Sequence, residues 1–128
     1  SLENYIRKLH RLKNIFEKKG LKLLIKPYQS ENLHKYENMD FEILPWDASC
    51  EVLFPLIKPK FTVGFLSTSM ITGKVLYGID SIDISNIFGL NENIEQRKKY
   101  NKIFKLFNDY MYRTNSFESL ENIIERIS

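Results

Sequence analysis

The stretch FTVGFLSTSMITGKVLYGID, residues 61–80, decides the fold class of this protein. Its first six residues, 61–66, are apolar and rich in β-formers, which is typical of a buried strand. Its second half carries apolar side chains at helical spacing and ends just before Gly78, which is typical of a helix and its C-terminal stop. Three hydroxyl residues stand between the two halves: Ser67, Thr68 and Ser69. The stretch therefore predicts a strand that leads through hydroxyl side chains directly into a helix.

The rest of the chain repeats this alternation of short strands and helices. Further strands are predicted at residues 21–27, 41–44 and 80–85. Amphipathic spacing predicts helices at residues 2–19, 47–57, 95–113 and 119–127, and Pro55 is expected to end or kink the second of these. Such alternation is typical of βαβ units, so we predict an α/β fold with a Rossmann-like parallel sheet of about four strands, flanking helices and a helical C-terminal extension.

Length and composition predict one domain. The 128 residues are 43% hydrophobic and 27% charged, which is ordinary for a globular chain. We assign residues 1–90 to the Rossmann-like core and residues 91–128 to a helical extension packed on the same domain. The net charge of +3 is too small to argue for nucleic acid, so no nucleic-acid partner is expected.

The predicted helix at 95–113 is basic on one side and aromatic on the other. We favour a helix that packs its aromatic side on the domain and exposes its basic side to solvent. The alternative is peripheral contact of this helix with an anionic membrane surface. No apolar run is long enough for a membrane span, so the expected location is the cytoplasm, with peripheral attachment to the inner membrane as the alternative.

The usual signatures of metal and cofactor sites are absent from the sequence. Cys50 is the only cysteine, and neither His10 nor His34 has a second ligand at suitable spacing, so no metal site is expected. The sequence contains no GxGxxG, GxxxxGK[ST] or GxSxG motif, so dinucleotide, P-loop and hydrolase functions have no support.

Candidate binding residues follow from the predicted sheet. Ligands of parallel α/β sheets bind beyond the carboxyl ends of the strands, where the strand-to-helix loops gather. The loops that this rule selects are Tyr28–Gln29, Pro45–Asp47 and Ser67–Ser69, together with Asn86. At the third loop, the free amides of a helix start and the hydroxyl groups suit a phosphate. N-capping of the helix is the alternative role, and both remain open at this point.

Two further side chains each allow two roles. Glu51 opens a predicted helix, where a carboxylate binds a ribose diol or simply complements the helix dipole. Trp46 lies in a loop at the same sheet edge, where it stacks on a base or packs over the edge. We favour packing for its side chain, with the loop backbone left to contact a base.

Three segments together resemble a known family. They are IKPYQ (25–29), LPWDASCEVLF (44–54) and GFLSTSMITGKVLYG (64–78). Their order and spacing resemble the C-terminal, nucleotide-binding half of bacterial GT-B sialyltransferases and capsular polysialyltransferases, over residues 20–85.

The resemblance implies roles for individual residues. Ser67 and Thr68 would hold the phosphate of a CMP-sugar, Glu51 its ribose, and the loop around Pro45 and Trp46 would lie near the cytosine. Tyr28 stands where the family has a histidine, and Gln29 stands where proline follows it. The CMP-sugar is a substrate, and no other cofactor is implied.

The expected function is therefore that of a donor-binding domain in a bacterial glycosyltransferase that builds surface polysaccharide or lipooligosaccharide. The family's general base belongs to an N-terminal domain that also receives the glycan acceptor, and this chain lacks it. We therefore expect nucleotide binding by this chain and no sugar transfer. The alternative is a small stand-alone α/β module that binds a protein, such as an immunity or antitoxin protein.

Overall fold

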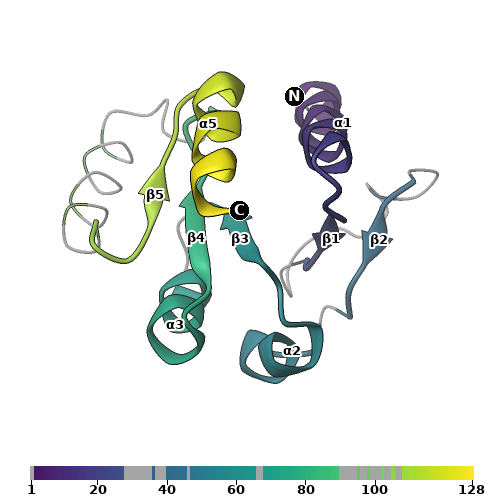
Figure 1. The fold of residues 1–128 in the computed structure, drawn as a ribbon. Coiled ribbons are helices and arrows are strands. Elements are labelled where there is room, and N and C mark those ends of the chain that lie inside the picture. Colours follow the sequence, from purple (N-terminus) through teal and green to yellow (C-terminus); the bar gives the residue numbers. More distant parts are fainter. Residues whose placement is uncertain are drawn as a thin grey trace. The chain divides into compact units, whose positions relative to one another are not determined.

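The structure, a computed structural model, consists of helices and short parallel strands in two compact units, residues 1–49 and 50–128 (Figure 1). It describes residues 2–27, 36, 40–45, 47–65, 68–89, 95, 98, 102, 105 and 108–128. Each unit is described by itself below. In both units every paired strand is parallel to its neighbour, so the predicted α/β class with parallel sheets is confirmed.

The first unit begins with the predicted amphipathic helix, α1 (Leu2–Lys18). Its buried side chains recur at helical spacing: Leu9, Leu12, Ile15 and Phe16. The chain leaves the helix at Gly20, whose φ of 73° is in the left-handed region that glycine adopts without strain. The helix predicted at residues 2–19 is therefore confirmed.

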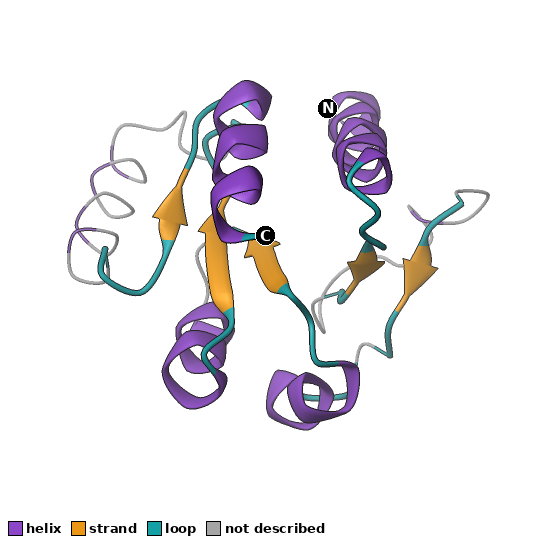
Figure 2. Ribbon diagram, in the orientation of Figure 1, coloured by secondary structure: helices purple, strands orange, loops and turns teal. Residues whose placement is uncertain are grey.

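The sheet of the first unit has two strands, β1 (Leu24–Ile25) and β2 (Glu42–Ile43), drawn as orange arrows in Figure 2. They pair in parallel, and the amide of Leu44 extends the ladder by donating to the carbonyl of Ile25 at 2.8 Å. Both strands are shorter than the apolar runs that predicted them.

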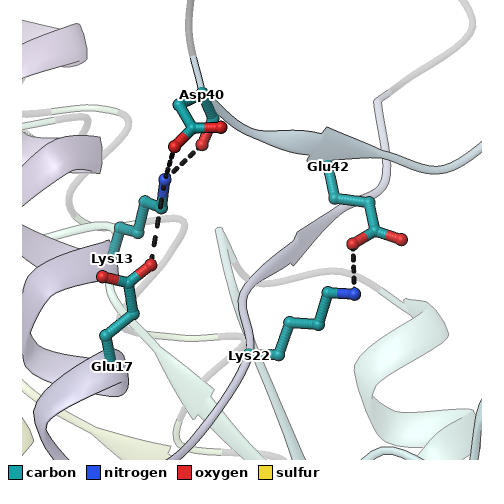
Figure 3. A network of polar contacts seen from close by, with 5 residues as sticks. All are labelled: Lys13, Glu17, Lys22, Asp40 and Glu42. Carbon is teal, nitrogen blue, oxygen red and sulfur yellow. Dashed lines mark hydrogen bonds and ion pairs between the residues drawn. The ribbon is translucent and has the colours of Figure 1, made fainter.

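Polar contacts join α1 to the segment that leads into β2 (Figure 3). The ammonium of Lys13 contacts the carboxylate of Asp40 at 3.2 Å, donates to the Asp40 carbonyl, and lies 3.8 Å from Glu17. It also lies 5.5 Å from the centre of the Phe41 ring. Because Asp40 is fully exposed, the packing of the helix contributes more to this arrangement than the ion pair does.

The sheet of the second unit has three strands, β3 (Phe61–Gly64), β4 (Asp80–Asp83) and β5 (Tyr112–Arg113). The strand order is β3-β4-β5, so β4 is central. Ile82 of β4 is fully buried. It is the register partner of Val63 in β3 and of Tyr112 in β5.

Three helices of the second unit have both ends within the described residues: α2 (Cys50–Ile57), α3 (Thr68–Tyr77) and α5 (Phe117–Ile127). The N-cap of α5 is Ser116, whose hydroxyl accepts a hydrogen bond from the amide of Ser119. The buried side chains of α5 form one stripe, made of Phe117, Leu120, Ile123 and Ile124. The helix predicted at 119–127 is thus confirmed, with a start two residues earlier than expected.

Pro55 was predicted to end or kink the helix, and the structure shows that it does not end α2. The helix continues to Ile57. Proline has no amide hydrogen, so the carbonyl of Glu51, four residues earlier, loses its helical donor. The hydroxyl of Tyr77, at the end of α3, lies 3.4 Å from this carbonyl and donates to it. A tertiary contact therefore compensates for a local defect.

The predicted helix at 95–113 is wrong at its C-terminal end. Residues 95, 98, 102 and 105 are helical and exposed, but residues 108–110 form a turn and Tyr112–Arg113 is β5. The amide of Thr114 continues the ladder by donating to the carbonyl of Asp83. Pairing with β4 overrides the helical pattern here, since strand pairing depends on residues distant in sequence.

We expect the stabilising contribution of the ion pair between Lys74 and Asp80 to be lost at alkaline pH. Its N–O distance is 2.6 Å, and this hydrogen bond raises the pKa of Lys74 above its ordinary value of 10.5. The pair therefore stabilises the fold at pH values below 10.5, and the contribution is lost as the pH rises through the higher pKa of the folded state. Because the Lys74 side chain is 34% exposed, we expect the pair to contribute less than about 1 kcal/mol to the free energy of unfolding.

The measurement compares urea unfolding of the wild-type protein and Lys74→Met at about pH 9 and at successively higher pH values above 10.5. At the lower pH, the wild-type protein should have a larger free energy of unfolding than Lys74→Met. This difference between the two proteins should shrink at the higher pH values. Lys98→Met, at an exposed helical position, serves as the control. A difference that stays constant with pH would contradict the prediction.

Candidate functional site

The polar residues of the second unit gather at the carboxyl edge of its sheet. Gly64, Asp83 and Arg113 are register partners at the ends of the three strands, so they form one row across the edge. Two strand spacings separate the outer members of this row by about 10 Å. Asp83 is buried, with 2% of its surface exposed. The edge can therefore bring groups from all three strand ends to one ligand.

The start of α3 is held against this edge by a chain of hydroxyl groups. Thr62 donates to Ser81 at 3.1 Å, and Ser81 donates to the carbonyl of Met70 at 2.9 Å. Ser81 is fully buried, and its bond to the Met70 carbonyl lies out of water. Gly64 allows the approach, because a Cβ there would lie 3.1 Å from the sulfur of Met70. The first turn of α3 is thus positioned by both β3 and β4.

The predicted hydroxyl residues fall on this helix start. Thr68 is the first residue of α3, and Ser69 follows it with a half-buried side chain. Ser67 lies outside the described residues. The first turn of α3 contains no acidic residue, whereas the first turns of α2 and α5 carry Glu51 and Glu118. An anion at the start of α3 would therefore meet the helix dipole without a competing carboxylate in that turn.

Glu51 lies in the exposed first turn of α2, as predicted. Its carbonyl contacts the hydroxyl of Tyr77, which is nine residues beyond Thr68 and about 13 Å along the helix axis. Glu51 is thus placed beside the later part of α3, and no described contact joins it to Ser69. A ligand that reached both residues would have to extend along α3.

Three other predicted residues, Tyr28, Gln29 and Trp46, lie outside the described residues. Pro45 is exposed, just beyond β2 in the unit of residues 1–49. Asn86 lies after β4 at the carboxyl edge, as predicted. The structure therefore places Thr68, Ser69 and Asn86 beyond strand ends of one sheet.

Sequence reasoning missed a second group of polar residues at this edge. A pocket of about 280 Å³ lies there, lined by the described residues Asn86, Arg113, Thr114 and Asn115. Arg113 is the last residue of β5, and Thr114 and Asn115 come directly after it. The sequence analysis had assigned the residues of β5 to a helix. A signal was present, since two tyrosines flank Met111 and the turn-forming run Thr-Asn-Ser follows Arg113.

Neither a metal cluster nor a membrane-spanning helix is found among the described residues. In that part of the chain, no three His, Cys, Asp or Glu side chains lie close enough together to hold a metal ion. None of the helices described there is long and apolar enough to cross a membrane.

Fold and site together define an α/β protein with parallel strands and a polar carboxyl edge. Comparisons with protein-family models, with curated proteins and with solved structures found no match.

Proposed function

We propose that this chain is the donor-binding domain of a bacterial glycosyltransferase similar to sialyltransferases and polysialyltransferases. The observation that carries the proposal is the junction of β3 and α3. There the helix begins beyond the carboxyl end of the strand and is fixed by Ser81, without an acidic residue in its first turn. The three segments that resemble the family add support, because the hydroxyl pair of the third segment falls on this junction.

In this proposal the helix start binds the phosphate of a CMP-sugar. The free amides of the first turn of α3 and the hydroxyls of Ser67, Thr68 and Ser69 would donate to the phosphate oxygens. Fixed donors at that place also stabilise the negative charge that develops on a leaving phosphate, and they do so without a metal ion. Glu51 would take the ribose, which requires a donor that extends along α3, because Glu51 lies beside Tyr77.

The proposed role is limited to binding the donor. Transfer to a glycan acceptor would need a second domain, so we expect this chain alone to bind CMP and to transfer no sugar. Tyr28, at the position of the family histidine, can donate a hydrogen bond to a phosphate but lacks a charge change near neutral pH. The proposed location is the cytoplasm, with peripheral contact with the inner membrane through residues 95–113 as the alternative.

The test is a titration of the protein with CMP, followed through backbone amide chemical shifts. We expect saturable shifts at Ser69 and Glu51, larger for CMP than for UMP or free phosphate. The double variant Ser67→Ala, Thr68→Ala removes two hydrogen bonds to a charged group and should weaken CMP binding about 10-fold or more.

The matched control for this titration is Thr72→Ala, which removes a hydroxyl one turn later in α3. It should bind CMP as the wild type does. Absence of shifts at millimolar CMP would contradict the proposal and leave the three hydroxyl residues as a helix cap.

A second candidate function, binding of a protein partner, is favoured by the exposed apolar surface of α2 and α3. Its side chains are Val52, Leu56, Val75 and Leu76, which are 55%, 76%, 58% and 65% exposed. The two helices pack on each other through Phe54 and Gly73, so these side chains belong to one helix pair. An immunity- or antitoxin-like module would use such a surface, and a failed CMP titration would move this function ahead.

A further inference from the structure

We propose that the exposed face of α2 pairs with the same face of a second copy of this chain, with the two helices antiparallel. This face consists of Val52, Pro55 and Leu56, with Glu51 at its start and Lys58 at its end. The inference rests on the second candidate function, for which it names the partner, and it is independent of nucleotide binding. Because Glu51 also belongs to the proposed CMP site, all measurements below use protein without nucleotide.

The centre of this face is apolar although it is exposed. Val52 and Leu56 are one helical turn apart and therefore lie on one side of α2, where 55% and 76% of their surfaces are exposed. Phe54, which lies between them in the sequence, is buried and packs against Gly73 of α3. Residues two apart in a helix lie on different sides, so the face of Val52 and Leu56 is turned away from α3. Exposed apolar side chains gathered in this way are typical of a surface that meets a partner.

The charges at the two ends of the face make it complementary to itself. Glu51 lies in the exposed first turn of α2, and the exposed Lys58 directly follows the last residue of the helix. When two copies of α2 lie antiparallel, the acidic end of each helix therefore meets the basic end of the other. A parallel pair would place like charges side by side, so the charges favour the antiparallel arrangement. The opposite partial charges at the two ends of a helix favour it as well.

The spacing of residues along α2 sets the register of this pair. A two-fold axis beside Phe54 places Val52 of each copy at the level of Leu56 of the other, because both lie two residues from that point. The same axis leaves Glu51 and the second copy's Lys58 offset by one residue, or about 1.5 Å along the helix axis. Apolar contacts and charge contacts are therefore satisfied in one register, and each contact occurs twice.

The small size of the face predicts a weak dimer. Tyr77, which is 43% exposed and donates to the carbonyl of Glu51, adds an aromatic side chain at its border, of a type that is enriched in interfaces. Even so, the face holds far fewer residues than the about 20–30 on each side of an interface of standard size. We therefore expect a dissociation constant of about 100 µM, at the weak end of specific association.

The test is sedimentation equilibrium of the 128-residue chain, which should change from mostly monomer at about 20 µM to mostly dimer at about 1 mM. Leu56→Gln removes an apolar contact twice in the symmetric pair and should weaken self-association about 10-fold or more. The matched control is Val75→Gln, at a position that is 58% exposed. Val75 is two residues from Gly73 and therefore lies on the side of α3 away from α2, so this variant should dimerise as the wild type does.

Charge reversal tests the antiparallel register. Glu51→Lys brings two lysines together at each end of the pair, and Lys58→Glu brings two glutamates together, so each variant alone should self-associate about 10-fold or more weakly. An equimolar mixture of the two variants restores both opposite-charge contacts and should form mixed dimers more tightly than either variant by itself. A change in folding of the monomer would not produce this recovery.

Lys58→Gly is a further variant that preserves the fold. Lys58 has a φ of 52°, in the left-handed region that glycine adopts without strain. The substitution removes an exposed ion pair at both ends of the dimer and should weaken self-association about 3-fold.

Three results would overturn the proposal. They are a monomer at all concentrations, a dimer that Leu56→Gln does not weaken, and a mixture of Glu51→Lys and Lys58→Glu that associates no better than either variant alone. The second result would place the interface on another surface, and the third would reject the antiparallel register. Failure of CMP to bind would contradict the donor-binding function alone, because self-association is measured without nucleotide.

Discussion

Replacing Ile82 with alanine is expected to lower the free energy of unfolding by about 2–5 kcal/mol. Ile82 is fully buried in β4, the central strand, and its register partners Val63 and Tyr112 flank it on both sides. Neighbours on both sides limit how far the structure can collapse into the cavity that alanine would leave. The loss is a large part of the about 5–15 kcal/mol that stabilises an ordinary domain. Urea unfolding followed by circular dichroism measures it.

The control for Ile82→Ala is Leu76→Ala, which removes a leucine side chain that is 65% exposed on α3. Because this side chain is mostly exposed, its removal deletes little buried apolar surface. The free energy of unfolding of Leu76→Ala should therefore stay within about 0.5 kcal/mol of the wild-type value. Equal losses in the two variants would show that β4 is not the centre of the sheet.

Replacing Gly73 with valine is expected to destabilise the protein by about 1–3 kcal/mol. A Cβ at this position would lie 3.0 Å and 3.2 Å from two carbons of the Phe54 ring. That ring is buried and packs edge-on against Tyr77, which restricts its retreat. Valine adds two methyl groups to the clash, and this effect should outweigh the few tenths of a kcal/mol, roughly, by which valine is a better helix former than glycine. Thermal and urea unfolding measure the loss.

A double-mutant cycle assigns this loss to the contact between α2 and α3. Phe54→Ala alone should cost about 3–5 kcal/mol, because it empties a core position. In the double variant Gly73→Val, Phe54→Ala, the valine occupies part of the space that the ring leaves, so the total loss should be smaller than the sum of the single losses. Strictly additive losses would show that the two positions do not touch.

The candidate site was predictable only in part. Ser69 and Asn86 were placed at the carboxyl edge because a strand followed by polar residues is a local pattern, visible without any tertiary information. Arg113, Thr114 and Asn115 were missed because the aromatic stripe before them continues a helical period. The backbone of Arg113 adopts a strand because its partner Asp83 is available, thirty residues earlier in the chain.

Pro55 illustrates the same limit within one helix. The sequence predicted that Pro55 would end or kink the helix, because proline supplies no donor to the carbonyl four residues earlier. Only the folded structure supplies the hydroxyl of Tyr77 at that carbonyl, and the helix then continues to Ile57.

The sequence by itself determined the elements that depend on local physics. The period of apolar residues determined α1 and α5, Gly78 marked the end of α3, and the apolar run at 61–66 marked β3. These signals lie within a few residues of the structure that they specify, so spacing and residue type suffice to read them.

Only the tertiary structure decided the strand partners and the residues that share the sheet edge. The row of Gly64, Asp83 and Arg113 joins three segments that lie between residues 61 and 113. Strand pairing satisfies backbone groups through distant partners, and its register depends on packing that no short stretch encodes. For this reason the helix start at Thr68 was visible in the sequence, whereas the pocket around Arg113 became visible only in the folded protein.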